Sequence, residues 1–158
     1  MATVIKDLVE YIGINEGELK NFKNFKQLNF ESDFHVPSEA PDIEQIVKVY
    51  ANVDICKYEV IETPIGISLE GQKLTGYKLL VFGDINYKIQ YIGDDENQVV
   101  QTFKHYIPFG VDIVLSQHFN NLSYITPYAF IEDIDAEQIA NRYVCLNLTL
   151  LLIADIKA

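Results

Sequence analysis

Apolar and polar residues alternate along most of the chain, which is the spacing of β-strands. In residues 85–91 every second side chain is isoleucine or tyrosine, and the three between them are polar. In residues 99–107, valine, phenylalanine and isoleucine face one way, whereas Thr102 and Lys104 face the other. Successive side chains of a strand leave opposite faces, so each run buries one face of a sheet. The polar residues 93–97 between the runs predict a solvated turn, and therefore a long antiparallel hairpin.

The same alternation predicts further strands on both sides of this hairpin. They cover residues 28–36, 47–60, 74–82, 109–115, 124–134 and 142–156. A change of phase near Cys56 predicts a bulge, and Gly76 and Gly83 are expected at bulges as well. Apolar residues on both faces near the end of the last strand, such as Leu151 and Ile153, predict a central strand.

Prolines and polar runs divide these strands. Pro108 is expected to end a strand because proline donates no hydrogen bond, and Pro127 predicts an edge strand for the same reason. Loops are predicted from residue 63 to 71 and from 116 to 123, and a turn from 135 to 141.

The first residues leave two possibilities open. Val4, Leu8 and Ile12 are spaced by four, which fits a short amphipathic helix, but valine and isoleucine also favour an extended arm. Polar residues 18–26 predict a linker. We therefore divide the chain into residues 1–26, an N-terminal helix or arm with its linker, and residues 27–158, one β-domain.

The elements together predict an all-β fold. Eight or nine strands are separated by turn signals, and no helical segment is long enough to connect parallel strands. This pattern is typical of an antiparallel β-sandwich. We expect such a sandwich, with a short N-terminal helix or extended arm.

Composition narrows the classes of partner. The chain has 158 residues, 49% of them hydrophobic, which excludes a disordered protein. Its net charge of −11 argues against nucleic acid as a partner, because phosphates attract basic surfaces. The first 19 residues contain neither a basic leader nor a long apolar run. We therefore expect synthesis in the cytosol and no membrane insertion.

No residue pattern predicts catalysis or cofactor binding. His35, His105 and His118 lie at no metal-ligand spacing, and surface positions are the favoured interpretation for His35 and His105. Cys56 and Cys145 lack the context of a nucleophile, and a Cys–His pair is the less favoured alternative. The acidic turn lacks the frame of a calcium loop, and no phosphate-binding glycine motif occurs. We expect no enzyme, no cofactor and no metal.

Aromatic side chains on polar faces instead favour protein interaction. Tyr50, Tyr58, Tyr106 and Tyr143 fall on such faces, and tyrosine is enriched at protein interfaces. Few of the predicted strands carry the lysines that protect a sheet edge from pairing. The pattern favours self-association or partner binding through edges.

Three motifs resemble one known family. Residues 37–49 read PSEAPDIEQIVKV, residues 69–92 contain EGQKLTG and KLLVFGDINYKIQYI, and residues 99–109 read VVQTFKHYIPF. In this combination the chain resembles the SPOCS domain of spore coat and exosporium proteins in endospore-forming Firmicutes, over about residues 8–156. Some members join this domain to a LysM module. No LysM sequence precedes Ala158, so we expect a stand-alone domain.

The resemblance implies a role in the protein shell of the spore and supplies no catalytic residues. We expect a structural, self-assembling homo-oligomer, made in the mother-cell cytosol and deposited on the spore surface, in the coat or the exosporium. It would associate with itself and with other spore coat proteins through strand edges and the N-terminal segment. The alternative is a monomeric protein- or glycan-binding module that docks onto other coat proteins. Cys56 and Cys145 are candidate cross-linking thiols, within or between subunits.

Overall fold

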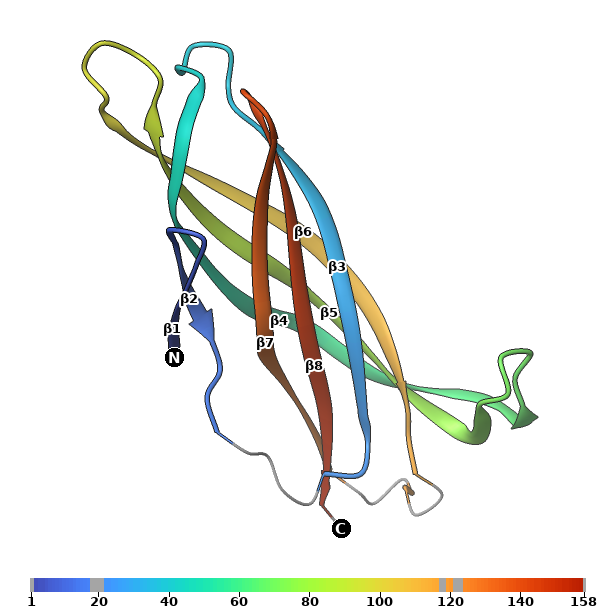
Figure 1. Ribbon diagram of the computed structural model, residues 1–158. Coiled ribbons are helices and arrows are strands. Elements are labelled where there is room, and N and C mark those ends of the chain that lie inside the picture. The colour runs from blue at the N-terminus through green and yellow to red at the C-terminus, as the bar shows by residue number, and fades with distance from the viewer. Residues whose placement is uncertain (1, 18–21, 117–118, 121–123, 158) are drawn as a thin grey trace.

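The fold consists of two β-sheets that share one core (Figure 1). A computed structural model describes residues 2–17, 22–116, 119–120 and 124–157 of the chain. These residues form eight strands and no helix: β1 (Ala2–Lys6), β2 (Val9–Ile14), β3 (Phe25–His35), β4 (Ile43–Ile67), β5 (Lys73–Gly93), β6 (Val100–Val114), β7 (Tyr124–Ala140) and β8 (Tyr143–Lys157).

The strand order explains how the chain builds two layers without a helix. One sheet has the order β1-β2-β4-β5-β6 and the other the order β3-β8-β7. All pairs are antiparallel except β2 and β4, which are parallel, so the expectation of a purely antiparallel fold is wrong at this pair. The chain leaves β2, crosses to the other sheet as β3 and returns beside β2 as β4. A strand of the opposite layer therefore takes the place of a crossover helix.

The core lies between the two sheets, as a β-sandwich requires. The inward side chains of β8 are fully buried, and the inward side chains of β5 that join the same cluster are buried as well. Aromatic rings join the layers on the β3–β6 side, where the ring centroids of Phe30 and Phe109 lie 5.5 Å apart and those of Phe34 and Phe103 lie 5.9 Å apart. The central position predicted for the last strand, β8, is confirmed.

The N-terminal segment is a β-hairpin, so the helix considered for residues 1–14 is wrong. Asp7 and Leu8 form the turn with φ of 49° and 68°. In β2, buried Val9 and Tyr11 alternate with less buried residues, as expected for a strand with one face against the core. At Gly13, φ is 125°, and a Cβ would lie 2.0 Å from the carbonyl oxygen of Ala51. Glycine is required there because any side chain would collide with β4.

Several strands are longer than predicted. β3 begins at Phe25, inside the expected linker. β4 continues to Ile67, into the expected loop, and β7 continues to Ala140, through all but the last residue of the expected turn. Pro108 does not end β6 but lies within it, opposite Asp84 of β5. Because β6 is an edge strand, the missing N–H of Pro108 faces away from β5 and costs no ladder bond.

One of the four register shifts between β4 and β5 lies where the change of phase predicts it. The β4–β5 register shifts between Ile55 and Lys57, which confirms the bulge near Cys56. The extra residue belongs to β4, and Gly83 lies opposite, where a Cβ would be 2.3 Å from the carbonyl oxygen of Asp54. A second shift, between Glu62 and Ile65, lies opposite Gly76. Gly83 therefore marks a close approach of the bulged strand, whereas at Gly76 glycine is favoured by a φ of 104°.

Candidate functional site

β3 and β6 leave uncovered edges on one side of the molecule. On the other side β1 is also an edge strand, and β4 pairs with β2 only at Lys48, Val49 and Tyr50. β3 and β6 are edge strands of different sheets and contact each other across the layers. Lys26 of β3 and Lys78 of β5 both form ion pairs with Asp112 of β6, and these pairs lower the pKa of Asp112, the hydrogen bond from Lys78 most. Within the described part of the chain, the outward backbone groups of β6 meet no further strand. β6 therefore offers an edge of 15 residues.

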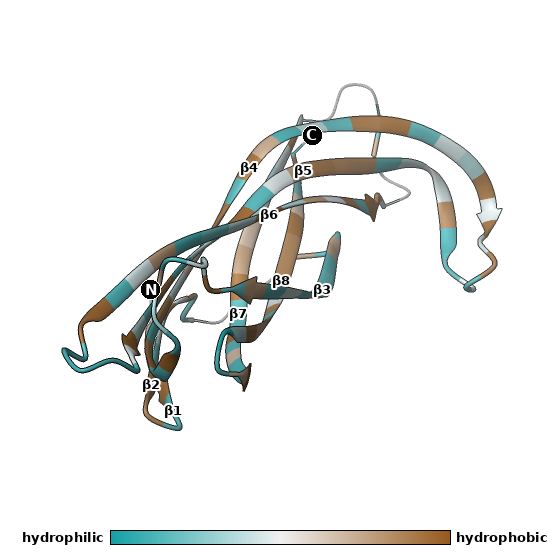
Figure 2. Ribbon diagram, turned by 90° about the horizontal axis from the view of Figure 1, so that it is seen from above, coloured by the Kyte–Doolittle hydropathy of each residue, from teal (hydrophilic) through white to brown (hydrophobic). Residues whose placement is uncertain are grey.

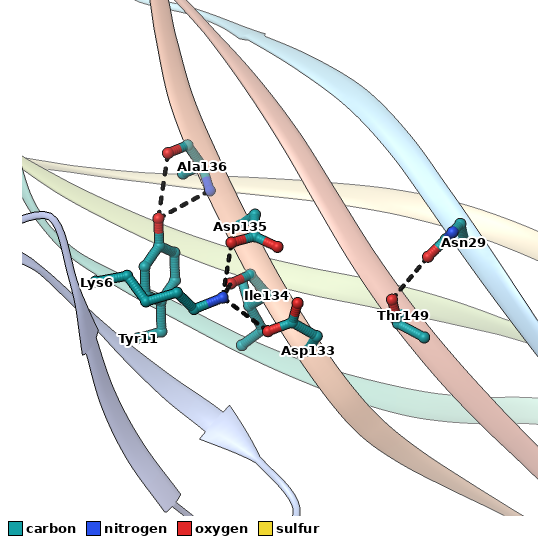
Figure 3. A network of polar contacts seen from close by, with 8 residues as sticks. All are labelled: Lys6, Tyr11, Asn29, Asp133, Ile134, Asp135, Ala136 and Thr149. Carbon is teal, nitrogen blue, oxygen red and sulfur yellow. Dashed lines mark hydrogen bonds and ion pairs between the residues drawn. The ribbon is translucent and has the colours of Figure 1, made fainter.

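The opposite edge, that of β7, is covered by the N-terminal hairpin (Figure 3). Asn15 pairs with Ile131 twice: its N–H donates to the carbonyl oxygen at 2.8 Å, and its side-chain oxygen accepts from the N–H at 2.6 Å. The Tyr11 hydroxyl accepts from the N–H of Ala136 at 3.0 Å and donates to its carbonyl oxygen at 3.2 Å. We call these contacts the β7 seam. They occupy backbone groups that would otherwise pair with another strand.

Lys6 adds two ion pairs to the β7 seam. Its Nζ lies 2.8 Å from Asp133 and 2.7 Å from Asp135, and it also donates to the carbonyl oxygen of Ile134. Partial burial opposes the charged form of Lys6, but the hydrogen bonds to both carboxylates outweigh it and raise its pKa. The pKa of Asp133 is lowered, although burial opposes this, because Lys6 donates to it. Lys6 and Asp133 are therefore ionised at neutral pH.

An open cavity of about 460 Å³ adjoins the β7 seam. Lys6, Tyr11, Gln45, Asp135 and Gln138 are among its lining residues. Burial raises the pKa of the Tyr11 hydroxyl, which is already held by Ala136. Lys6 and Asp135 of this lining form an ion pair with each other, which holds the hairpin in place.

Of the two histidines predicted at the surface, His35 is found there and His105 is not. His35 is exposed and stacks on Tyr143, with 4.8 Å between ring centroids. His105 is not a surface residue: it points toward the core between Phe34 and Tyr87, and its Nε2 is buried. Burial lowers the pKa of His105, so it is neutral at pH 7. His105 lies two positions from both Phe103 and Ile107, so the alternation along the strand indicates the same inward face. His118 lies outside the described residues, and among those described no cluster of three metal-ligating side chains occurs.

The two cysteines lie on opposite outer surfaces of the molecule. Cys56 is exposed on the five-stranded sheet, where its Sγ lies 3.4 Å from the carboxylate of Asp84. Cys145 alternates with the buried residues of β8 and so faces outward from the three-stranded sheet. Both layers and the core separate the thiols, whereas a disulfide needs Cα atoms within about 7 Å. A disulfide between them within one chain is therefore excluded, and any such bond must join two chains.

The end of the β4–β5 ribbon is an apolar surface that the sequence pattern did not reveal. Figure 2 shows the two strands curving away from the rest of the molecule. Ile65, Ile67 and Leu69 near the tip are exposed by 84%, 77% and 109%. The tip falls in the stretch expected to be a loop, where alternation gave no signal. Of the four tyrosines predicted on polar faces, Tyr58 and Tyr106 are exposed and Tyr50 and Tyr143 are half-buried.

The turn between β5 and β6 is solvated, as predicted. Asp94, Asp95 and Glu96 are exposed, and Asp95 accepts the N–H of Gln98 at 2.8 Å. The carboxylate thus stabilises the turn itself. Within the described ranges of the chain, no helix is long and apolar enough to cross a membrane.

Comparison with known proteins identifies the family. Residues 42–139, from the start of β4 nearly to the end of β7, match the family described as SipL, SPOCS domain. No curated protein and no solved structure matches the chain significantly. The match covers more than half of the 158 residues and includes the central hairpin on which the resemblance rests. The chain therefore belongs to the SPOCS domain family, which is associated with sporulation.

Proposed function

We propose that this protein is a structural, self-assembling and non-catalytic component of the endospore envelope, in the coat or the exosporium. It is made in the mother-cell cytosol and deposited on the spore surface. Copies associate with each other and with other spore coat proteins through strand edges and through the N-terminal segment. Membership of the SPOCS family supports the link to sporulation.

The observation that carries the proposal is the long uncovered edge of β6. The β7 edge is closed by Asn15, Tyr11 and Lys6, whereas β6 presents a strand of 15 residues with its outward backbone uncovered. At about 3.4 Å per residue this edge is about 50 Å long. Edge strands of this length pair with other chains unless they are blunted. Along β6 only Pro108 and Lys104 act against pairing.

Support for a non-catalytic role comes from the state of the ionisable groups. Lys6, Asp133 and Asp135 at the β7 seam form ion pairs, and His105 is packed against aromatic rings. Such groups hold the fold together rather than transfer protons.

Electron microscopy of the purified protein tests the proposal. We expect ordered assemblies that grow with concentration. Thr102 is an even number of residues from Pro108 along β6, so its N–H also faces away from β5. The variant Thr102→Pro removes this outward N–H. It therefore keeps the hydrogen bonds between β5 and β6 but blocks pairing at the edge. Thr102→Val is the matched control and should assemble like the wild type. A wild type that stays monomeric at all concentrations refutes self-assembly.

A second candidate is a monomeric module that docks onto other coat proteins or a glycan. It is favoured by an open cavity of about 520 Å³ on the outer face of the five-stranded sheet, lined by Tyr50, Asn86 and Tyr106 among others. Aromatic and amide side chains of this kind bind polar ligands. A stable monomer that retains a coat protein or glycan would favour this candidate.

A further inference from the structure

The two edge strands β3 and β6 run antiparallel to each other across the layers, on the same side of the molecule (Figure 1). Three contacts join them: Lys26–Asp112, Phe30–Phe109 and Phe34–Phe103. Residue numbers rise along β3 while they fall along β6, and the two numbers of each contact add up to 137, 138 or 139. Each residue of β6 therefore has a defined position at the same height along β3.

The backbone groups that each edge presents follow from the hydrogen bonds just beyond the two strands. The N–H of Leu115 donates to Tyr77, so odd-numbered residues of β6 bond to β5 and even-numbered residues face outward. The N–H of Val36 donates to Arg142, so even-numbered residues of β3 bond to β8 and odd-numbered residues face outward. The two edges can therefore pair only where an even-numbered residue of β6 stands opposite an odd-numbered residue of β3.

We propose that two copies form a symmetric dimer in which β6 of each copy pairs antiparallel with β3 of the other. This inference deepens the proposed self-assembly and rests on it, because it names the edges that meet and their symmetry. A two-fold axis parallel to the strands, on this open side, brings each β6 beside β3 of the second copy at an unchanged height. The five-stranded sheet of each copy then continues into the three-stranded sheet of the other, and the edges of β3 and β6 are hydrogen-bonded in both copies.

Two buried polar atoms select the register of this pairing. Within the described part of the chain, the Oγ of Ser32 and the Nε2 of His105 are buried and form no hydrogen bond. If opposed residue numbers add up to 137, Ser32 of the second copy stands directly opposite His105. The Cα atoms of such a non-hydrogen-bonded pair are about 4.5 Å apart, which lets the Ser32 hydroxyl donate to the imidazole. A sum of 139 sets Ser32 opposite Ile107 instead and leaves both polar atoms unpaired.

The same register places opposite charges in one cross-strand pair. Lys104 stands opposite Asp33 of the second copy, with Glu31 as a diagonal neighbour. Within the described ranges none of these three side chains forms an ion pair, and Asp33 accepts only the Tyr143 hydroxyl. In its own chain Lys104 instead stands opposite Lys88, and like charges in that position destabilise a sheet. The dimer therefore gives Lys104 an acidic neighbour that the single chain lacks.

Apolar side chains along the open side gain cover in the dimer. Phe103 and Ile107 of β6 and Phe30 of β3 pack against the core but are only half-buried. In the proposed register Ile107 stands opposite Phe30 of the second copy, and Phe103 stands opposite Phe34. The removal of these side chains from water adds hydrophobic stabilisation to the hydrogen bonds of the paired edges.

Disulfide trapping tests the pairing and its register, in a chain whose own thiols are replaced by Cys56→Ser and Cys145→Ser. The pair Glu31→Cys/Tyr106→Cys places thiols directly opposite each other in the two copies, with Cα atoms about 5.5 Å apart. The control Asn29→Cys/Tyr106→Cys is offset by two residues, which puts the Cα atoms about 7–8 Å apart, beyond the reach of a disulfide. Within one chain these thiols lie on the outer faces of different sheets and do not meet.

Charge reversal provides a second test that needs no cysteine. Lys104→Glu and Asp33→Lys should each weaken dimerisation at least about threefold in sedimentation equilibrium, because like charges then stand opposite each other. The combined variant restores opposite charges and the net charge of the wild type, so its dimerisation should recover. Circular dichroism and thermal melting report whether each variant folds.

The outcomes separate this inference from the proposed function. After mild oxidation, Glu31→Cys/Tyr106→Cys should give at least about tenfold more covalent dimer on non-reducing gels than Asn29→Cys/Tyr106→Cys. A wild type that stays monomeric refutes the proposed self-assembly, and the inference with it. A wild type that assembles, while the two cysteine pairs cross-link equally or not at all, leaves self-assembly standing and refutes the pairing of β6 with β3. Folded charge variants that dimerise like the wild type refute the register.

Discussion

Removing the Tyr11 hydroxyl should loosen the β7 seam by a predictable amount. In Tyr11→Phe the ring still fills its buried site, but the N–H and the carbonyl oxygen of Ala136 both lose their partner. Leaving buried backbone groups without hydrogen bonds costs about 1–3 kcal/mol of the free energy of unfolding. With an unfolding entropy of about 2.1 cal/mol/K per residue, this lowers the melting temperature by about 3–9 °C.

Thermal unfolding at low protein concentration measures this change, and Tyr58→Phe provides the control. Tyr58 lies on β4 and is 46% exposed, so loss of its hydroxyl should change the free energy of unfolding by less than about 0.5 kcal/mol. Hydrogen exchange adds a local readout, since the N–H of Ala136 should exchange faster in Tyr11→Phe. If both variants melt together and Ala136 stays protected, Tyr11 does not hold the hairpin on β7.

Three other variants test separate parts of the structure. The hydrogen bond to Asp84 raises the pKa of Cys56, so the rate of alkylation of Cys56 should increase with pH up to and beyond pH 9. Asp84→Asn should increase this alkylation rate at neutral pH, and an unchanged rate would contradict the contact. Gly83→Ala should destabilise the fold by about 2 kcal/mol or more, seen as a lower urea midpoint, because its Cβ would meet the carbonyl oxygen of Asp54; a wild-type midpoint would show that β4 can shift. The pKa of Asp112 is lowered in the fold, so its contribution to stability is complete above the ordinary value of 3.8 and is lost as pH falls through the folded pKa. Asp112→Asn should therefore flatten the dependence of the free energy of unfolding on pH below about pH 4. An unchanged dependence would contradict the pairing of Asp112 with Lys26 and Lys78.

Local alternation was enough to predict most of the sheet. The inward residues of β8, the central β5–β6 hairpin and the bulge near Cys56 follow from side-chain parity alone. Pro127 correctly indicated an edge strand, β7, because a missing donor is tolerated only there.

Features that depend on distant partners could not be predicted in the same way. Whether Pro108 ends a strand depends on which side of β6 is free, and this is fixed by the position of β6 in the sheet. Residues 135–140 show no apolar–polar alternation, yet they continue β7 because Lys6 and Tyr11 of the N-terminal hairpin bind them. The hairpin itself depends on a turn at Asp7 and Leu8 with positive φ, which neither residue type indicates strongly.

The arrangement of charged residues on the surface depends on strand register as well as on the alternation of side chains along each strand. Parity places Lys88 and Lys104 on outward faces, but only the pairing of β5 with β6 sets them opposite each other. Likewise, Asp33 and Glu137 are 104 positions apart in sequence and meet across β8 through Cys145. Which charged side chains lie side by side is therefore a property of the fold, and the net charge of −11 conceals it.

Immunogold electron microscopy of sporulating cells tests the central claim most directly. An antibody against this chain should label the mother-cell cytosol first and then the layer that surrounds the forespore, with the label remaining on released spores. Label that stays dispersed in the mother cell at every stage, and is absent from purified spores, would contradict a structural role in the spore envelope.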